Sequence, residues 1–358
     1  MPKRKKSPLL IGLTARLLML IAAGGLWLSY LSVFVNPAKA WFMTLFGLFY
    51  VPLLALNLFL LVWAAVRRSR AILIPLVALL PSLFVVGRYV QFSGPEEPVE
   101  GGIKVISYNV GRFASPARRL HLDDEKTCAD SIARFLRGTG ADIICLQKFH
   151  IQNPKQLKSW LASHFKDYDA EYYVFTDKRG CYGNVTLSRF PIRDKGKLEF
   201  GKSTNLALYS EYEVSGRRLR VYNCHFQSYS LSLSKLAHRL QGDTKNAIKD
   251  TETKMKTSIE RRPGQVEAVL RDIEQAPVTS LIVGDFNDTP LSYTYWRLTR
   301  AHRDSFIGGG RGFGATFTRL RPLLRIDYIL YPSEYQVLSH EVMHVRYSDH
   351  YPVQAILQ

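Results

Sequence analysis

The chain has 358 residues, a formal net charge of +18 and 47% hydrophobic residues. This length allows two or three ordinary domains, or one large domain with an additional segment. Residues 1–90 contain no Asp or Glu and are rich in Leu, Phe, Val, Ile and Ala, which excludes a water-soluble surface for this part of the chain.

Three apolar runs follow one another at residues 9–35, 41–66 and 71–90. Each approaches or exceeds the roughly 20 residues that a helix needs to cross about 30 Å of hydrocarbon. A cleaved signal peptide would be a single, shorter apolar stretch. The sequence therefore predicts a membrane anchor of three transmembrane helices within residues 1–90.

The basic residues of this segment indicate its orientation. They cluster at positions 3–6, before the first run, and at positions 67, 68 and 70, between the second run and the third. The positive-inside rule places both clusters in the cytoplasm. Three crossings then leave the C-terminal domain outside, so we predict a multi-pass protein of a bacterial inner membrane with a periplasmic domain.

The remainder of the chain is mildly basic. It holds 38 of the 48 Lys and Arg residues and all 30 acidic residues, a net charge of +8. This charge is compatible with a phosphate-bearing partner and, equally, with simple solubility. The four cysteines show no C-x-x-C spacing, so neither a zinc site nor a disulfide pair can be assigned.

Residues 91–102 form a linker rich in Pro, Gly and Glu, which places a domain boundary near residue 103. Short apolar strands then alternate with helices. Strands are predicted at 103–110, 142–146, 172–175, 183–187, 206–214, 219–225, 279–283, 326–330 and 335–344. Helices are predicted at 123–136, 154–165, 264–275 and 292–300. Several adjacent strands look like hairpins, which favours a two-sheet α/β sandwich over a purely parallel sheet.

Five polar clusters stand at the ends of predicted strands. They lie in VISYNVGRF (Asn109), VYNCHFQS (His225), IVGDFNDTP (Asp285 and Asn287), LRIDYIL (Asp327) and YSDHYPV (Asp349 and His350). Each cluster alone is compatible with a turn cap or a buried core histidine. Together they predict a site on one rim of the sandwich.

In this order, the motifs resemble the endonuclease/exonuclease/phosphatase superfamily, the deoxyribonuclease I-like proteins, over residues 103–358. GDFN, IDYIL and SDHYPV are the most specific pieces, and GNVTLSRFPI at 183–192 is also similar. The resemblance implies a four-layer α/β sandwich, with two mixed β-sheets flanked by helices. It also implies hydrolysis of phosphodiesters or phosphomonoesters with a divalent metal, Mg²⁺ or Mn²⁺. The chain is thus identified as a membrane-anchored bacterial member.

The resemblance also implies catalytic roles. Asp285 orients or deprotonates the attacking water, and Asn287 beside it holds the phosphate. His225 and His350 hydrogen-bond the phosphoryl oxygens, and Asp327 supports the leaving-group side. These types suit phosphoryl transfer, which needs an in-line nucleophile and positive charge against the nonbridging oxygens.

The implied metal ligands are Asn109, Asp349 and a glutamate at position 148, where this chain has a lysine. Asp349 is alternatively expected to hold His350 in register. An ammonium within about 4 Å of a divalent ion repels it by several kcal/mol even at an effective dielectric of about 20. Three interpretations remain: Lys148 contacts the phosphate directly, a metal binds weakly through the other ligands, or the domain binds phosphate without cleaving it.

The expected function is that of a membrane-anchored, metal-dependent phosphoesterase acting on nucleic acid or a phospholipid head group. The alternative is a catalytically impaired phosphate-binding module. A basic stretch at 228–263 is compatible with a phosphate-facing or membrane-facing flap and equally with a solvated helix or loop. Besides the substrate and the membrane, we infer no obligate protein partner.

Overall fold

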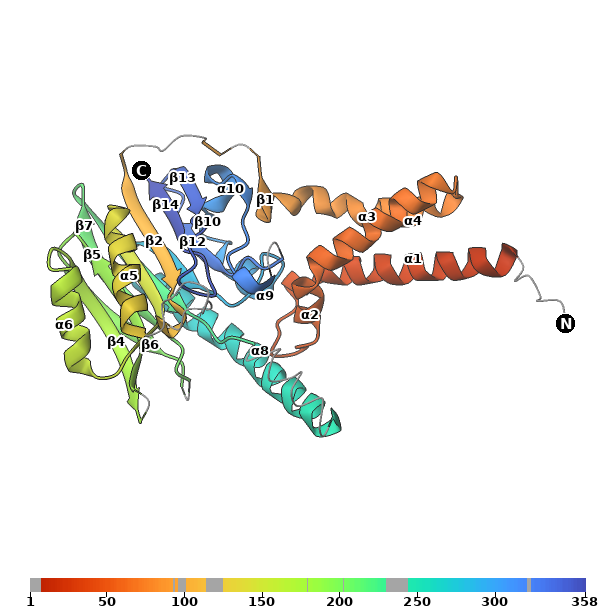
Figure 1. Cartoon of the computed structure of the whole chain (residues 1–358). Coiled ribbons are helices and arrows are strands. Elements are labelled where there is room, and N and C mark those ends of the chain that lie inside the picture. Colours follow the sequence, from red (N-terminus) through yellow and green to blue (C-terminus); the bar gives the residue numbers. More distant parts are fainter. Residues whose placement is uncertain are drawn as a thin grey trace.

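A computed structural model of the chain describes residues 8–92, 94–95, 101–113, 125–178, 180–201, 203–229, 244–320 and 323–358. A helical N-terminal region projects from one side of an α/β sandwich (Figure 1). The basic cluster at 3–6, residues 93 and 96–100 of the predicted linker, and residues 230–243 of the basic stretch lie outside the described residues.

The N-terminal region consists of one long helix and several shorter ones. In chain order these are α1 (Pro8–Leu31), η1 (Ser32–Phe34), α2 (Met43–Leu48), α3 (Tyr50–Val66), η2 (Arg70–Ile72), α4 (Leu73–Leu79), η3 (Leu80–Phe84) and η4 (Val86–Arg88). Among the described residues, one segment, Gly12–Phe34, is long and apolar enough to cross a membrane. Tyr50–Val66 and Arg70–Phe84 are shorter apolar helices. The prediction of three transmembrane helices is therefore corrected to one candidate span.

Prolines account for the difference. α2 ends at Leu48, four residues before Pro52, whose ring would clash with the Leu48 carbonyl group in a continuous helix. Likewise α4 ends at Leu79, and Pro81 is the second residue of the 3₁₀ segment Leu80–Phe84 that follows. The apolar composition predicted helices correctly, but these interruptions shorten the second and third.

Apolar side chains dominate the surface of this region. Of the exposed large hydrophobic side chains in the described part of the chain, all but Ile248, Ile307, Phe313 and Leu320 precede residue 93. Inside the bundle, the amide of the buried Asn57 donates to the carbonyl groups of Ala22 (3.0 Å) and Leu53 (2.9 Å), whereas Asn57 Oδ1 has no hydrogen-bond partner among the described residues. Extended apolar surfaces of this kind mark contact with a partner or with a lipid phase.

The sandwich contains two six-stranded sheets. The first has the order β13-β14-β2-β3-β5-β4, with β2 (Ile103–Asn109), β3 (Ile143–Ile151), β4 (Asp169–Asp177), β5 (Gly180–Ser188), β13 (Val337–Val342) and β14 (Val353–Leu357). The second has the order β10-β12-β9-β8-β7-β6, with β6 (Asp194–Glu199), β7 (Leu206–Val214), β8 (Arg217–His225), β9 (Thr279–Asp285), β10 (Arg303–Asp304) and β12 (Asp327–Tyr331). The pairs β2–β3 and β8–β9 are parallel and the others antiparallel, so both sheets are mixed.

Three apolar layers hold the sandwich together. Residues such as Cys145 and Leu281 pack between the two sheets. Helices α5 (Glu125–Gly138) and α6 (Pro154–His164) cover the first sheet, and α8 (Thr244–Gln275) and α9 (Tyr293–Leu298) cover the second. The prediction of a four-layer α/β sandwich with two mixed sheets is confirmed. All four cysteines are buried.

Each predicted strand overlaps an observed one, whereas β6, β14 and the two-residue strands β1 (Val90–Gln91), β10 and β11 (Gly312–Phe313) were missed. β6 has the sequence DKGKLE and pairs only with β7, so as an edge strand it needs no apolar pattern. The helix predicted at 264–275 begins much earlier, at Thr244, and continues through Pro263. Short elements complete the fold: η5 (Gly111–Phe113), α10 (Phe306–Gly309), η7 (Thr318–Leu320) and the pair of β1 with β11.

The helical region contacts the loop that follows β9. The Ser32 hydroxyl donates to the Leu291 carbonyl oxygen (3.3 Å), and the Thr289 hydroxyl donates to the Gly47 carbonyl oxygen (3.3 Å). A second contact lies nearby, where the Arg325 guanidinium donates to the Arg88 carbonyl oxygen (3.0 Å). These contacts attach the bundle to the sandwich next to the motifs singled out in the sequence.

Candidate active site

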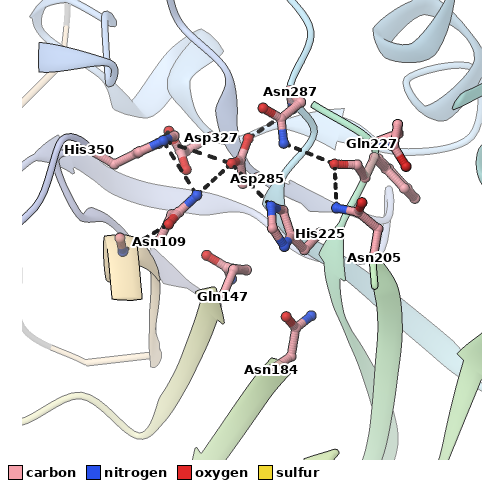
Figure 2. Close-up of polar contacts among 12 residues, drawn as sticks. Asn109, Gln147, Asn184, Asn205, His225, Gln227, Asp285, Asn287, Asp327 and His350 are labelled. Atoms are coloured by element: carbon pink, nitrogen blue, oxygen red, sulfur yellow. Dashed lines mark hydrogen bonds and ion pairs between the residues drawn. The ribbon is translucent and has the colours of Figure 1, made fainter. Parts of the chain in front are cut away.

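Most of the polar side chains predicted from the sequence lie together in one cluster (Figure 2): Asn109, His225, Asp285, Asn287, Asp327 and His350. Strand register explains this cluster. The parallel pairing of β8 and β9 places His225 opposite Asp285, and the antiparallel pairing of β9 and β12 places Asp327 opposite the same residue. Asn109 ends β2 and His350 precedes β14. Both of these strands belong to the first sheet, whereas β8, β9 and β12 belong to the second. Both sheets therefore contribute to a single site.

Asp285 lies at the centre of this site and is 1% exposed. The Asn109 amide donates to its Oδ2 (2.7 Å), and the backbone N–H of Asn287 donates to its Oδ1 (2.8 Å). Asn287 adopts a left-handed conformation, with φ of 51°, which turns the chain back toward the carboxylate. The Nε2 atoms of His225 and His350 each lie 3.9 Å from Oδ2.

His350 is held by a second carboxylate. Its Nδ1 lies 2.9 Å from Asp327 Oδ2, and its Nε2 lies 3.3 Å from the Asn109 amide nitrogen. Burial alone would lower the pKa of His350, but the charges of Asp327 and Asp285 outweigh burial and raise the pKa to about 9. The imidazole is therefore protonated at neutral pH. Asp327, which the sequence assigned to the leaving-group side, makes the contact expected of Asp349.

The pKa values of His225 and Asp285 shift in opposite directions. Burial, the Lys148 charge and the His350 charge lower the pKa of His225 to about 3, so this imidazole is neutral. Burial and the Asp327 charge raise the pKa of Asp285 to about 6. The site thus combines one imidazolium, one neutral imidazole and a carboxylate that titrates close to neutral pH.

Lys148 lies in a β-bulge of β3, between the register pairs of Leu146 and Phe149, and has φ of 54°. It is half-buried and, among the described residues, has no hydrogen-bond or ion-pair partner. Together with burial, the charge of Lys148 lowers the pKa of His225. Burial would raise the pKa of Asp349, but the charges of His350 and Lys148 outweigh burial and hold the pKa of Asp349 below its usual range. The ammonium group therefore belongs to the electrostatics of the site.

A buried amide network supports the site, and among its amide side chains only Asn287 was singled out in the sequence. Gln147 donates to the Asn223 side-chain oxygen (2.9 Å), and Asn184 donates to the Asn223 carbonyl oxygen (3.0 Å). On the other side of Asp285, the amides of Asn287 (2.9 Å) and Asn205 (3.0 Å) both donate to the Phe226 carbonyl oxygen. Amide side chains inside apolar strands were the available signal, because buried polar groups need partners.

An ion pair ties α8 to the Asp285 loop. Arg262 Nη1 lies 2.7 Å from Asp288 Oδ2, with both side chains almost fully buried, and the Tyr229 hydroxyl donates to Asp288 Oδ1 (2.7 Å). The sequence analysis placed Arg262 only within a basic stretch. Asp288 follows Asn287 directly, so the ion pair with Arg262 holds the loop that carries Asp285 and Asn287.

Donor atoms of Asp285, Asp327 and His350 all lie within 4.8 Å of one another, a spacing that could hold a metal ion. Asp327 Oδ1 is buried and has no hydrogen-bond partner in the described part of the structure, which leaves it available as a ligand. These carboxylates fit a hard divalent cation. In the predicted ligand set, Asn109 Oδ1 already accepts the Gly111 N–H (3.0 Å), and a protonated Lys148 offers no lone pair.

Several solved structures share this fold at 20% identity or less. An endonuclease/exonuclease/phosphatase from Beutenbergia cavernae has 20% identity and a TM-score of 0.54, with 72% of each chain covered. A mannosyl-6-phosphatase from Bacteroides thetaiotaomicron has 17% identity and a TM-score of 0.52, covering 72% of this chain and 99% of that one. The human Nocturnin catalytic domain, with bound sulfate, has 16% identity and a TM-score of 0.50, covering 72% and 93%.

No curated protein sequence matches the chain. A domain of unknown function, DUF8431, matches residues 12–89. The Endonuclease/Exonuclease/phosphatase family matches residues 106–350, which span more than half of the chain and carry every side chain of the site. The chain therefore belongs to the endonuclease/exonuclease/phosphatase family.

Proposed function

We propose that this protein is a membrane-attached phosphoesterase whose reaction takes place at Asp285 and His350. The observation that carries the proposal is the pairing of a buried carboxylate, fixed by Asn109 and Asn287, with an imidazolium fixed by Asp327. The family supplies the reaction class, and this arrangement supplies a base and a cation for it.

Asp285 is suited to act as the general base. Its pKa of about 6 leaves it ionised at pH 7 but basic enough to accept a proton from an attacking water. The two hydrogen bonds from Asn109 and Asn287 hold both carboxylate oxygens in place, so little reorganisation is needed when the proton moves.

His350 is suited to bind the phosphoryl group. As an imidazolium it can donate from Nε2 to a nonbridging oxygen and stabilise the charge that develops there. His225, as a neutral imidazole, can donate one further hydrogen bond. The carboxylates of Asp285 and Asp327, whose donor atoms lie within 4.8 Å of each other, would hold Mg²⁺ or Mn²⁺, which would neutralise phosphoryl charge when bound.

The N-terminal region supports attachment to a membrane. α1 carries the candidate span Gly12–Phe34, and nearly all exposed large hydrophobic side chains of the described residues lie in this region. Figure 1 shows the start of α1 and the turn between α3 and α4 at the same end of the bundle, farthest from the sandwich. The basic residues at 3–6 precede the candidate span in the sequence, which favours a cytoplasmic N-terminal side and a periplasmic sandwich in a bacterium.

Lys148 supports a second candidate, a module that binds phosphate esters without cleaving them. A half-buried ammonium stands where the family resemblance implies a carboxylate ligand. Such a cation attracts phosphate whether or not a metal binds. Binding of a phosphate ester without turnover, with or without Mg²⁺, would favour this candidate.

The test is hydrolysis of bis(p-nitrophenyl) phosphate by the full chain in detergent, with and without Mg²⁺ or Mn²⁺. Asp285→Asn and His350→Ala should each lower turnover by at least about a hundredfold. His164→Ala is the control, because His164 pairs with Asp130 away from the site. Full activity in either site variant would show that the reaction occurs elsewhere. DNA, RNA, sphingomyelin and phosphoinositides would then be compared as substrates.

A further inference from the structure

An open-sided cavity of about 610 Å³ lies along the N-terminal bundle, between α1, α2 and α3, and its lining residues Leu18 and Ile21 are more than half exposed. Its volume falls in the roughly 300–1,000 Å³ range of small-molecule sites. It extends along α1 from Leu18 to Leu28, with Phe46 of α2 and Leu60 of α3 on the other sides. Every lining residue is Leu, Ile, Phe, Ala or Gly. A ligand of this cavity finds no polar partner, so it must be a hydrocarbon.

Two glycines of α1 shape the cavity. A Cβ on Gly24 would meet no heavy atom within 4 Å, whereas a Cβ on Gly25 would lie 3.2 Å from a methyl group of Leu53. Gly24 therefore opens onto space and Gly25 permits close packing of α1 against α3. Glycine inside a helix is destabilising relative to alanine. The cavity at Gly24 is the structural feature that a side chain there would remove.

The cavity ends beside the loop of the active site. One helical turn after Leu28, the Ser32 hydroxyl donates to the Leu291 carbonyl oxygen (3.3 Å). Gly47 follows the lining residue Phe46, and its carbonyl oxygen accepts from the Thr289 hydroxyl (3.3 Å). Thr289 and Leu291 belong to the loop that begins with Asp285 and Asn287. The end of the cavity nearest the sandwich thus adjoins the segment that carries the proposed base.

We propose that the cavity binds the hydrocarbon chain of a lipid phosphate ester whose phosphate group reaches the Asp285 site. This inference rests on the proposed function and names its substrate class, a membrane lipid in place of nucleic acid. The cavity supplies the apolar part of recognition, since a hydrocarbon chain gains free energy in proportion to the area it buries. Lys148, a half-buried basic side chain in the β-bulge of β3, supplies positive charge for the phosphate.

The experiment measures inhibition of bis(p-nitrophenyl) phosphate hydrolysis by two phosphatidic acids that differ only in chain length, dioleoyl and dihexanoyl. The full chain in detergent should be inhibited by the long-chain lipid at concentrations at least about tenfold lower, because more apolar area is buried. Gly24→Leu fills the cavity and should reduce this difference to less than about threefold. Its hydrolysis of the soluble ester should not change.

Gly12→Leu is the matched control. Gly12 lies on the same helix, a Cβ there also meets no heavy atom within 4 Å, and it does not line the cavity. Partition of the long-chain lipid into detergent affects both variants alike. An equal chain-length difference in Gly24→Leu and Gly12→Leu would overturn the lipid site and leave the proposed function intact. Absence of soluble-ester hydrolysis in wild type would overturn both.

Two further measurements cover other outcomes. A phosphatidic acid with a photoreactive chain should label the α1 and α3 peptides that line the cavity, more strongly than a photoreactive diacylglycerol does. Equal labelling by both lipids would show bulk lipid in the cavity and would overturn the proposal.

Sedimentation tests a second copy as the occupant: a wild-type dimer that Gly24→Leu makes monomeric would also overturn the proposal. Labelling of wild type needs no variant, so misfolding of Gly24→Leu does not affect this result.

Discussion

The carbonyl oxygen of Leu291 occupies the space in which a side chain on Gly47 would begin. The backbone of α2 therefore contacts the backbone of the loop after β9, with no room for a side chain between them. The same loop carries Asp285 and Asn287. Attachment of the bundle and geometry of the proposed active site are thus linked through a few residues of chain.

Gly47→Val should separate the two contact partners. Overpacking of this kind costs typically about 1–3 kcal/mol, so we expect a lower melting temperature of the full chain in detergent and reduced ester hydrolysis. Gly12→Val changes a helical glycine that has open space around it and should show neither effect. Unchanged melting of Gly47→Val would mean that the bundle does not dock on this loop.

Lys148→Glu tests the role of the lysine. If Lys148 only removes a metal ligand, the change should raise Mg²⁺ affinity and Mg²⁺-dependent turnover, because it replaces a cation by a carboxylate. If Lys148 takes the place of the metal, metal-independent turnover should vanish in Lys148→Glu and nearly vanish in Lys148→Met. We expect the first result, since a divalent ion offers two charges and a coordination geometry.

Lys158→Glu is the control for charge alone, because Lys158 is exposed on α6. Mg²⁺ affinity and turnover are measured in all four proteins. Unchanged Mg²⁺ affinity in Lys148→Glu would show that position 148 does not face the metal.

The pH dependence of hydrolysis should report Asp285 and His350. Wild-type activity should fall below about pH 6, where Asp285 takes up a proton, and above about pH 9, where His350 loses one. The Asp327 charge raises both pKa values, so Asp327→Asn should move both limits to lower pH. A pH profile of kcat/KM checks this, and an upper limit that stays in place would rule out the proposed role of Asp327.

Asp304→Asn should destabilise the sandwich. Arg325 makes two hydrogen bonds to Asp304 (2.6 and 2.7 Å), and both side chains are 1% exposed. Removing one partner leaves a buried charge without compensation, a loss of about 3–5 kcal/mol in the free energy of unfolding. Glu213→Gln, at the exposed pair with Arg193, should change that free energy by less than about 1 kcal/mol. Chemical denaturation of both variants gives the comparison.

The same ion pair should make the protein sensitive to acid. Burial would raise the pKa of Asp304, but Arg325 outweighs it and holds the pKa below its usual range. A carboxyl whose pKa is lower in the folded state stabilises above its unfolded value of about 3.9, and this contribution is lost as pH falls further. In Asp304→Asn, the part of the acid destabilisation due to this group should be absent.

A reporter enzyme fused after Gln358 tests the orientation. The basic residues at 3–6 precede the candidate span Gly12–Phe34 in the sequence and favour the cytoplasm for the N-terminal side of this span, so the reporter should be active only outside the cytoplasm. Activity of the Gln358 fusion in the cytoplasm would refute the periplasmic location of the sandwich.

Local patterns in the sequence were sufficient for much of the fold. Strand β7 was predicted with its observed bounds, and Asp285, Asp327 and His350 were singled out because polar residues ended apolar strands. Alternation of side chains along a strand, and the placement of functional groups where strands end, need only neighbouring residues. The edge strand β6 escaped because its charged sequence carries no such pattern.

Tertiary structure decided which of these groups touch. The pairing of β9 with β12 brings Asp327, and not the Asp349 next to His350 in sequence, to the imidazole Nδ1. Two helices dock on one loop, α2 through Gly47 and α8 through Arg262. Gly47 and the loop residue that it contacts are more than 200 residues apart in the sequence. Neighbouring residues determine strands and helices, but contacts of this kind depend on register between strands and packing between layers, which only the complete fold determines.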